Sequence, residues 1–333
     1  MQDIWLAFLQ EQGAVIKDNN SIEFDNTNIN INETAIVSPL SGFAVLAVSG
    51  NDRHTFLHAQ FINDLNLIEK PAAQLSAWCN ARGQVITNFL IINTGISSLL
   101  IFKQDQKEFV QKRLGMFILR SKVTIEDISE TSPLLGTANI KDLSLLTPNA
   151  PTHAGEITAH EDLIIICHPD SSGRYLIMGG IEAQKNKLSE LGKLLSIVSS
   201  SVWNVLDILA GLPWISTTTQ EQYLPQMLNL DALKGLSYQK GCYPGQEVIA
   251  RLHYRGEVKK RLQLIKAERP LIVGNAVHMQ DANNKVGMII NTEIHPDGWS
   301  YALAVIELDK INEKLFSDNR EISLLELPYA IES

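Results

Sequence analysis

The chain has 333 residues, of which 45% are hydrophobic and 20% charged, and its formal net charge is −9. This is an ordinary globular composition, and the length suits two or three domains. The negative charge argues against nucleic-acid binding by the whole surface, although a local basic segment can still bind an anion. No apolar run reaches the roughly 18 residues of a membrane span, and the acidic N-terminus lacks the basic region of a signal peptide. We therefore expect a cytoplasmic protein with no membrane partner.

The first third of the chain predicts an α+β subdomain. Residues 1–12 have the apolar spacing of an amphipathic helix, and the asparagine-rich stretch 18–33 predicts a loop or weak hairpin. Strands are expected over 43–50, 73–79, 84–93, 98–102 and 122–128, and helices over 51–61 and 107–118. The turn Asn80–Gly83 joins two of these strands as a hairpin, which favours an antiparallel sheet with helices on one side.

The rest of the chain predicts a second α+β region and a small β domain. Residues 129–160 lack periodicity and are interpreted as a connection. Strands over 162–168 and 174–180 precede helices over 181–198 and 201–211. Closely spaced short strands after Gly256 predict an antiparallel barrel or sandwich. The predicted domains are residues 1–128, 129–255 and 256–333.

The three cysteines, Cys79, Cys167 and Cys242, are far apart and form no CxxC pair, so they give no metal-ligand spacing of their own. Cys79 and Cys167 end apolar runs and are expected to be structural. No metal site is predicted from them.

Cys242 lies in the most distinctive stretch of the chain, KGCYPGQEVIARLHYRGEVKKR (240–261), which has six basic and two acidic side chains. A short helix is expected to begin just after Pro244 and Gly245. A cysteine near a helix start and near Lys240 is placed to ionise, because the helix dipole and the ammonium both favour a thiolate. Cys242 and Lys240 are therefore the candidate catalytic residues.

This stretch resembles the signature of the YgfZ family of folate-binding proteins, which are relatives of the glycine cleavage T-protein. Other segments agree in order: FLHAQFINDL (56–65), AWCNARGQV (77–85), RSKVTI (120–125), AGLPWI (210–215) and LPQMLNLDAL (224–233). Several ordered motifs identify a family far better than one does.

The resemblance implies an α+β, T-protein-like fold: two ferredoxin-like subdomains around a central folate pocket, and a C-terminal antiparallel β-barrel. It implies folate (tetrahydrofolate) as cofactor and a role in assembling or repairing iron–sulfur clusters in client enzymes, including tRNA-modifying methylthiotransferases. The partners would be those enzymes or cluster-assembly proteins, with tRNA reached indirectly.

The resemblance also implies folate-binding residues. The aromatic positions of the family's pocket correspond to Phe43 and Trp203, whose flat rings suit stacking against a pterin. Candidates in the signature are Tyr243, Gln246, Glu247 and Arg255. Gln246 and Glu247 can also cap the helix. Arg255, with the basic residues Arg251, Lys259, Lys260 and Arg261, could hold a folate tail, could bind RNA phosphate, or could form a solvated face.

Two departures separate the chain from the T-protein. Thr87 and Asn88 stand where the T-protein carries adjacent aspartates, and neither can accept a proton or stabilise a cationic transition state as a carboxylate can. Leu209 stands where relatives often carry a glutamate that could contact the pterin. A folate-dependent aminomethyl or one-carbon transferase of the T-protein type is thus the alternative function, and a tRNA-binding module is a third. Cys242 could serve as a nucleophile or redox thiol, as a ligand of a shared cluster, or as a structural thiol.

Overall fold

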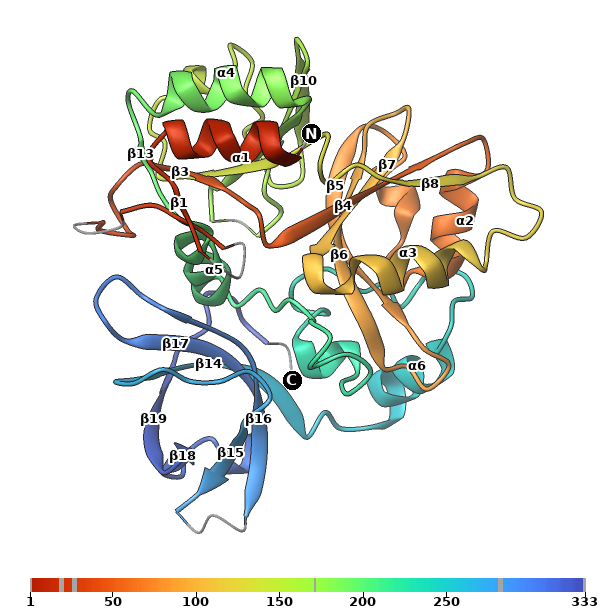
Figure 1. Cartoon of the computed structure of the whole chain (residues 1–333). Coiled ribbons are helices and arrows are strands. Elements are labelled where there is room, and N and C mark those ends of the chain that lie inside the picture. Colours follow the sequence, from red (N-terminus) through yellow and green to blue (C-terminus); the bar gives the residue numbers. More distant parts are fainter. Residues whose placement is uncertain (1, 18–20, 26–28, 171, 281–283, 332–333) are drawn as a thin grey trace. The chain divides into compact units, whose positions relative to one another are not determined.

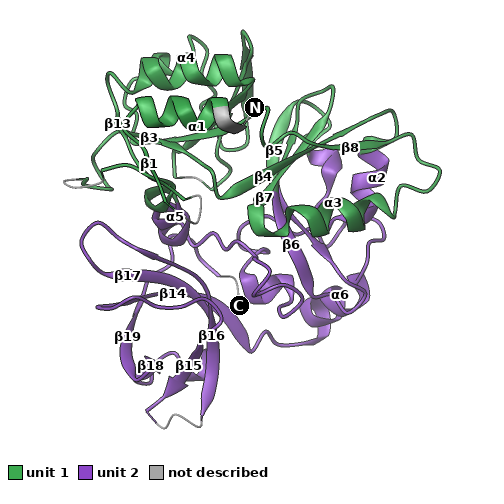
Figure 2. Cartoon of the chain, viewed as in Figure 1, with its two compact units in different colours: residues 1–53, 68–74, 90–203 green, residues 54–67, 75–89, 204–333 purple. Residues whose placement is uncertain are grey.

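The computed structural model of the chain describes residues 2–17, 21–25, 29–170, 172–280 and 284–331 (Figure 1). The chain forms two compact units (Figure 2). Unit 1 comprises residues 1–53, 68–74 and 90–203, and unit 2 comprises residues 54–67, 75–89 and 204–333. The three domains predicted from the sequence stay a prediction.

A six-stranded sheet with two helices on one face makes up much of unit 1. Its strand order is β10-β11-β12-β9-β3-β13, antiparallel except for the β13–β3 pair. The strands are β3 (Ile36–Pro39), β9 (Leu134–Ala138), β10 (Ile157–His160), β11 (Leu163–Cys167), β12 (Tyr175–Gly179) and β13 (Ser196–Ile197). Helices α1 (Gln2–Glu11) and α4 (Ile181–Leu191) lie side by side (Figure 1). Apolar side chains of both helices and of the strands share one buried core.

A five-stranded sheet has the order β5-β6-β7-β4-β8, and the boundary between the units runs through β5 and β6. Its strands are β4 (Phe43–Ser49), β5 (Ala72–Cys79), β6 (Val85–Asn93), β7 (Ser98–Lys103) and β8 (Thr124–Asp127). Helix α3 (Lys107–Gly115) connects β7 to β8 in unit 1, by way of the short turn η2 (Gln104–Gln106). Strands β1 (Val15–Ile16) and β2 (Ile22–Glu23), of two residues each, pair in antiparallel orientation. The loop or hairpin predicted over 18–33 falls partly outside the described residues.

Unit 2 combines helices and turns with a closed barrel. Helix α2 (Arg53–Gln60) opens it, α5 (Ser200–Leu209) begins in unit 1 and continues in unit 2 from Asn204, and α6 (Gln246–Arg255) follows later in the chain. Short 3-10 turns are η1 (Leu65–Ile68), η4 (Pro225–Leu228) and η5 (Leu308–Lys310), and η3 (Leu143–Leu145) lies in unit 1.

The barrel closes in the order β14-β17-β16-β15-β18-β19 (Figure 1). Its strands are β14 (Lys260–Ala267), β15 (Ala276–Met279), β16 (Lys285–Ile294), β17 (Ser300–Glu307), β18 (Leu315–Ser317) and β19 (Arg320–Leu325). One core cluster is formed by barrel strands and the loop after β14, and a second joins β14, β16 and β17 to residues of η4, α6 and the β5–β6 hairpin. Closure removes the exposed strand edges of an open sheet. The predicted barrel is confirmed, although β18 was not anticipated.

Two of the predicted elements are wrong. The helix expected over 181–198 ends at Leu191, where Gly192 is the C-cap, and residues 196–197 form β13 instead. The apolar spacing that suggested continuation includes Leu194, which is 65% exposed. The connection expected over 129–160 contains the fully buried strand β9 as well as η3 and β10. A short strand such as Leu-Leu-Gly-Thr-Ala lacks the alternation that marks a half-buried strand, because it is buried on both faces.

Among the described residues, no helix combines the length and the apolar character needed to cross a membrane. The cytoplasmic location stays a prediction.

Candidate functional site around Cys242

The three cysteines, all of which the structure describes, differ sharply in their exposure. Cys79 and Cys167 are buried, as expected, and burial raises the pKa of both thiols. Cys242 is exposed. It lies in the loop between the turn that ends at Lys240 and the first residue of α6, Gln246. The short helix predicted after Gly245 is confirmed.

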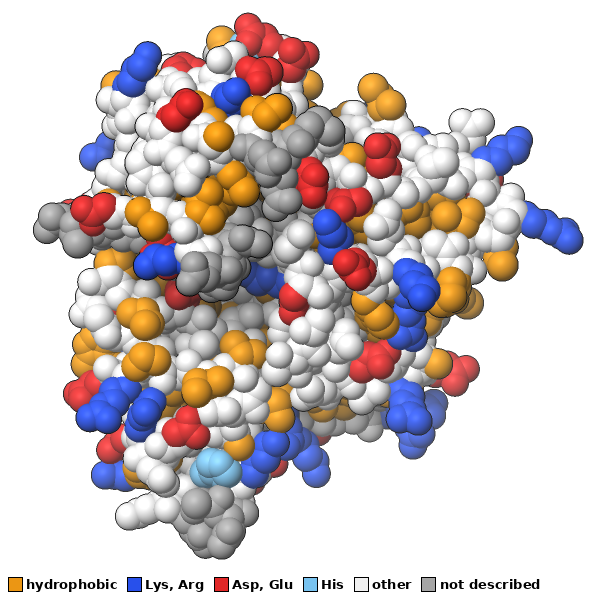
Figure 3. Space-filling view, viewed as in Figure 1, with side chains coloured by type: hydrophobic (Ala, Val, Ile, Leu, Met, Phe, Trp, Pro, Cys, Tyr) orange, Lys and Arg blue, Asp and Glu red, His pale blue; other side chains and the backbone are white. Residues whose placement is uncertain are grey.

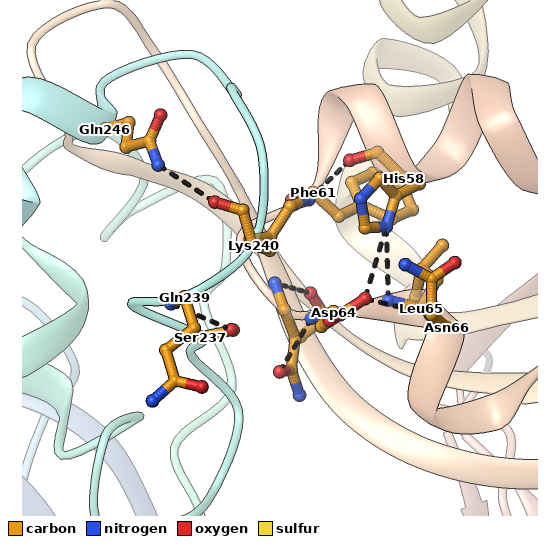
Figure 4. A network of polar contacts seen from close by, with 11 residues as sticks. His58, Phe61, Asp64, Leu65, Asn66, Ser237, Gln239, Lys240 and Gln246 are labelled. Atoms are coloured by element: carbon orange, nitrogen blue, oxygen red, sulfur yellow. Dashed lines mark hydrogen bonds and ion pairs between the residues drawn. The ribbon is translucent and has the colours of Figure 1, made fainter.

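Lys240 anchors the start of this loop to the end of α2 (Figure 4). Its Nζ donates hydrogen bonds to the carbonyl oxygens of His58 and Phe61, at the C-terminal end of the helix. The last carbonyls of a helix have no partner within the helix, and a cation is favoured there by the helix dipole. The ammonium predicted to face the thiol is therefore engaged with the backbone of α2.

Lys240 is buried, and two half-buried titratable groups, His58 and Asp64, lie close to it. Lys240 itself is 6% exposed, and burial lowers its pKa from 10.5 to about 8, while Asp64 opposes the shift. His58 Nδ1 lies 3.6 Å from Asp64 Oδ1 and accepts a hydrogen bond from the Leu65 amide at 3.4 Å. Burial, and then the charge of Lys240, lower the pKa of His58. Both shifts disfavour positive charge in this enclosed region.

Tyr243 and Gln246, which follow Cys242 in the chain, hold the loop in place. Tyr243 is 7% exposed and belongs to the core cluster that includes Ile249, and its ring centroid lies 5.1 Å from Lys240 Nζ. Burial raises the pKa of its hydroxyl. The Gln246 side-chain amide donates to the Lys240 carbonyl at 3.3 Å (Figure 4). The exposed Cys242 thiol thus lies on a loop that is held at Lys240 and at Tyr243.

A close approach of two glycines adds a third anchor. Gly245 has φ +82°, and a Cβ there would lie 2.5 Å from Gly83 Cα and 2.6 Å from Asn80 O. Gly83, in the turn of the β5–β6 hairpin, also has a positive φ of +76°. Only glycine tolerates both the left-handed backbone and this contact. The hairpin turn and the Cys242 loop are therefore packed backbone against backbone.

Three of the segments singled out in the sequence therefore meet inside unit 2: 56–65, 77–85 and 240–247. The sequence did not predict that His58 and Asp64 lie at this site. Both belong to FLHAQFINDL (56–65), one of the segments that agree with the family, and that membership was the available signal.

Helix α6 carries the other signature residues. Glu247 is exposed in its first turn, where an acid is favoured by the dipole, and Arg255 is exposed at its end. Near that end the His253 ring stacks on Tyr238 at 3.7 Å, and Tyr254 is 66% exposed. Such a face can hold a planar or anionic group.

The basic cluster predicted for the end of this stretch is not uniform. Lys260 pairs with Glu307 at 2.9 Å, and Arg261 is 6% exposed and pairs with Asp231 at 2.7 Å. Arg251, Arg255 and Lys259 remain on the surface. On the face of the molecule shown in Figure 3, acidic and basic side chains are interspersed.

The two aromatic residues expected to hold a pterin both lie in unit 1 and are both covered. Phe43 is 7% exposed, and Lys103 Nζ lies 4.4 Å from its ring centroid. Trp203 is 2% exposed, with Arg174 Cζ at 4.5 Å from its ring centroid. The Trp203 ring also lies on the backbone of Gly136, where a Cβ would come within 2.4 Å of it. As they lie, these rings do not fit a stacked pterin.

Asn88 and Thr87 are structural in this fold. Asn88 is 2% exposed; its Nδ2 donates to Pro213 O at 2.8 Å and its Oδ1 accepts from the Ile215 amide at 2.9 Å. Thr87 is fully buried beside it. A buried acid, Asp207, lies two residues before Leu209. It accepts a hydrogen bond from Trp214 Nε1 at 2.8 Å. Asp207 therefore orients Trp214 in the AGLPWI segment.

No group of three or more histidine, cysteine or acidic side chains in the described ranges could hold a metal ion. Any cluster bound at Cys242 would therefore need ligands from elsewhere.

Comparison with known proteins places the chain by fold and by sequence. The solved structure of the glycine cleavage system aminomethyltransferase T from Bartonella henselae matches with a TM-score of 0.77, covering 97% of this chain and 96% of that one at 13% identity. The tRNA-modifying protein YgfZ of Colwellia psychrerythraea is 31% identical over 287 residues, covering 83% of this chain and 86% of that protein. The protein of the same name from Escherichia coli is 28% identical over 304 residues, covering 88% and 93%. No family model matches the chain.

The fold is that of the glycine cleavage T-protein, with an exposed thiol on a three-point anchored loop. The chain belongs to the YgfZ family of tRNA-modifying proteins.

Proposed function

We propose that this protein is an accessory factor that supports the assembly or repair of iron–sulfur clusters in client enzymes, among them tRNA-modifying methylthiotransferases. Its working group is the Cys242 thiol. tRNA modification would then depend on it indirectly, through those enzymes. The names of its relatives support the link to tRNA modification, and the iron–sulfur role comes from the family resemblance.

One observation carries the proposal: Cys242 is exposed on a loop that is anchored at Lys240, at Tyr243 and at the turn through Gly245. A loop held at three points presents its exposed side chain in one place at low entropic cost. A thiolate in that position can bind iron or attack a disulfide of a partner. Lys240, with its ammonium against α2, acts here as a positioning residue.

The test is complementation of a strain that lacks its own copy of the gene. Wild-type protein should restore the methylthiolated nucleosides of tRNA, measured by mass spectrometry, and Cys242→Ala should not. Cys242→Ser replaces only the sulfur atom by oxygen, so its failure would assign the effect to sulfur. Protein level and thermal melting of each variant control for folding. Full restoration by Cys242→Ala would refute the proposal.

Folate enters as the ligand implied by the family and by the T-protein fold. Because Lys103 and Arg174 cover the Phe43 and Trp203 rings, a pterin could stack there only if these head groups moved. Titration of folate and tetrahydrofolate against tryptophan fluorescence tests this separately. Saturable quenching that Trp203→Phe abolishes would support binding at Trp203, and an unchanged emission would remove folate from the proposal.

Aminomethyl transfer, the activity in the name of the structural relative, finds no support in the chain's own residues. Asn88 and Thr87 are buried, and both polar atoms of the Asn88 amide are hydrogen-bonded to backbone. Neither residue can supply the carboxylate that stabilises a developing positive charge.

A further inference from the structure

The turn between α3 and β8 (Figure 1) carries a run of large apolar side chains that are exposed. Met116 is 64% exposed, Phe117 is 42% exposed and Leu119 is 89% exposed. We call these three residues the apolar tip. Single exposed apolar residues are common on soluble proteins, but several within four positions indicate a binding surface.

Cations flank the apolar tip on both sides. Residues 112–122 contain Lys112, Arg113, Arg120 and Lys122 and no acidic residue, in a chain of net charge −9. Lys112, Arg120 and Lys122 are exposed, and Arg113 is half-buried. The local positive charge therefore reaches solvent, where it favours an acidic partner.

The tip is held by specific backbone contacts. The Phe117 amide donates to Leu114 O at 3.1 Å, and the Ser121 amide donates to Ile118 O at 2.8 Å. The Lys122 amide donates to Asp52 Oδ2 at 2.7 Å, which ties the turn to the loop before α2. A preformed tip loses little conformational entropy when it binds.

Leu119 adopts a backbone conformation that its side chain disfavours. Its φ is +46°, in the left-handed region that favours glycine. The side chain gains almost no burial in return, since it is 89% exposed. Burial of the Leu119 side chain therefore does not repay the cost of this backbone conformation.

An open hollow of about 680 Å³ lies beside the tip, lined by Asp52, Phe117, Ile118, Leu119, Arg120 and Ser121. It has apolar walls with one carboxylate and one guanidinium at its edge. A hollow of this size can receive a side chain from a partner protein.

We propose that the apolar tip is a docking surface for an acidic partner protein. Leu119 and its two neighbours would enter an apolar pocket of the partner, Arg120 and Lys122 would pair with carboxylates around that pocket, and the hollow would take a partner side chain. A lipid surface fits less well, because a bilayer offers no side chain to fill the hollow. The identity of the partner, an iron–sulfur client enzyme, rests on the proposed function.

Binding to a purified iron–sulfur tRNA methylthiotransferase from the same organism tests the proposal, by calorimetry at two salt concentrations. Leu119→Gly removes the side chain and relieves the positive φ, so the variant should stay folded while its affinity falls at least tenfold. Leu119→Asp should fall further. Ile96→Asp is the matched control, since Ile96 is 85% exposed in unit 1 on the turn between β6 and β7, and its affinity should change less than twofold.

Affinity of wild type should fall as salt rises, because the cations contribute. The proposal is overturned if wild type does not bind the enzyme, or if Leu119→Gly binds as tightly as wild type. The tip would be assigned to lipid instead if wild type bound phosphatidylglycerol vesicles, Leu119→Asp did not, and neither protein bound the enzyme. Cys242→Ala should dock normally. If Cys242→Ala bound the enzyme as wild type does and also restored tRNA modification, the proposed function would be refuted and the docking surface would stand.

Discussion

Lys240 is the residue whose chemistry differs most from a surface lysine. Its ammonium is buried against the carbonyls of His58 and Phe61, and burial lowers its pKa to about 8. The unfolded chain holds this proton up to about pH 10.5, the ordinary value for lysine. Between these two values the unfolded state binds more protons than the folded state, so the free energy of unfolding rises with pH.

We therefore expect wild type to gain stability between pH 8 and pH 10 relative to Lys240→Met. This substitution keeps a long unbranched side chain and removes its charge. The gain is at most about 1.4 kcal/mol per pH unit for one proton. Urea unfolding of both proteins at pH 8, 9 and 10 measures the difference, and groups that titrate equally in both proteins cancel. Parallel pH profiles would show that Lys240 has the same pKa folded and unfolded.

Asn88 makes a prediction about the missing T-protein aspartate. Its amide donates to Pro213 O and accepts from the Ile215 amide, and a carboxylate can only accept. Asn88→Asp should leave the Pro213 carbonyl facing a buried negative charge, and should lower the free energy of unfolding by about 1–3 kcal/mol. Urea denaturation measures this. Asn149→Asp makes the same charge change at an exposed position and should have little effect. A stable Asn88→Asp protein would contradict the structural role.

At this scale the sequence singled out Cys242 but could not show what Lys240 contacts. The two residues joined by the Lys240 to His58 hydrogen bond are 182 positions apart. Side-chain direction in a loop depends on where such distant segments pack. The proximity of Lys240 to Cys242 along the chain therefore suggested an ammonium–thiolate pair, whereas the ammonium binds α2.

At the scale of elements, the loop before α6 depends on a single glycine contact. Gly245→Ala would place a Cβ within 2.6 Å of backbone atoms of both Gly83 and Asn80, at a φ of +82°. Backbone cannot yield as a flexible side chain can, so we expect a loss of at least about 1–2 kcal/mol and displacement of the loop. Gly241→Ala, in the same loop, meets nothing within 4 Å and should be tolerated.

Thermal melting of the two glycine variants, together with complementation, distinguishes a folding effect from a positioning effect. Gly245→Ala should lose tRNA modification even where its protein level matches that of Gly241→Ala. Equal activity of the two variants would show that the hairpin contact does not position Cys242.

Elements with strong periodicity were predictable, and buried short ones were not. The amphipathic helix at the N-terminus, the hairpin around Asn80–Gly83 and the short helix α6 are confirmed. Strand β9 was missed because all five of its residues are buried, between β12 and β3, which lie far from it in sequence. Helix α4 was predicted too long because an exposed leucine happened to continue its spacing.

At the scale of the whole chain, the family motifs predicted the T-protein fold and the barrel, while the covering of Phe43 and Trp203 depends on packing that no motif encodes. The basic run at the start of the barrel illustrates the same limit. Lys260 and Arg261 are adjacent cations at the start of β14, and neighbouring strand residues point to opposite sides. Only the structure shows that one is on the surface and the other buried.

Arg261 joins the barrel to the rest of unit 2. Its Nη1 donates to Asp231 Oδ1 at 2.7 Å and to Gln226 O at 2.9 Å, and the side chain of Arg261 is 7% exposed. Arg261→Met would leave Asp231 and a buried carbonyl without this cation, so we expect a loss of about 3–5 kcal/mol in the free energy of unfolding. Lys260→Met removes a pair whose side chains are 42% and 30% exposed, and should cost at most about 1 kcal/mol.

Urea unfolding followed by tryptophan fluorescence measures both variants, and Trp299, in the turn before β17, gives a signal within the barrel. If the link matters as argued, the barrel of Arg261→Met should unfold at a lower urea concentration than that of Lys260→Met. The double variant Arg261→Met/Asp231→Leu should recover part of the loss, because the unpaired carboxylate is what makes the single change costly. Equal midpoints for the two single variants would mean that the buried pair contributes no more than a surface one.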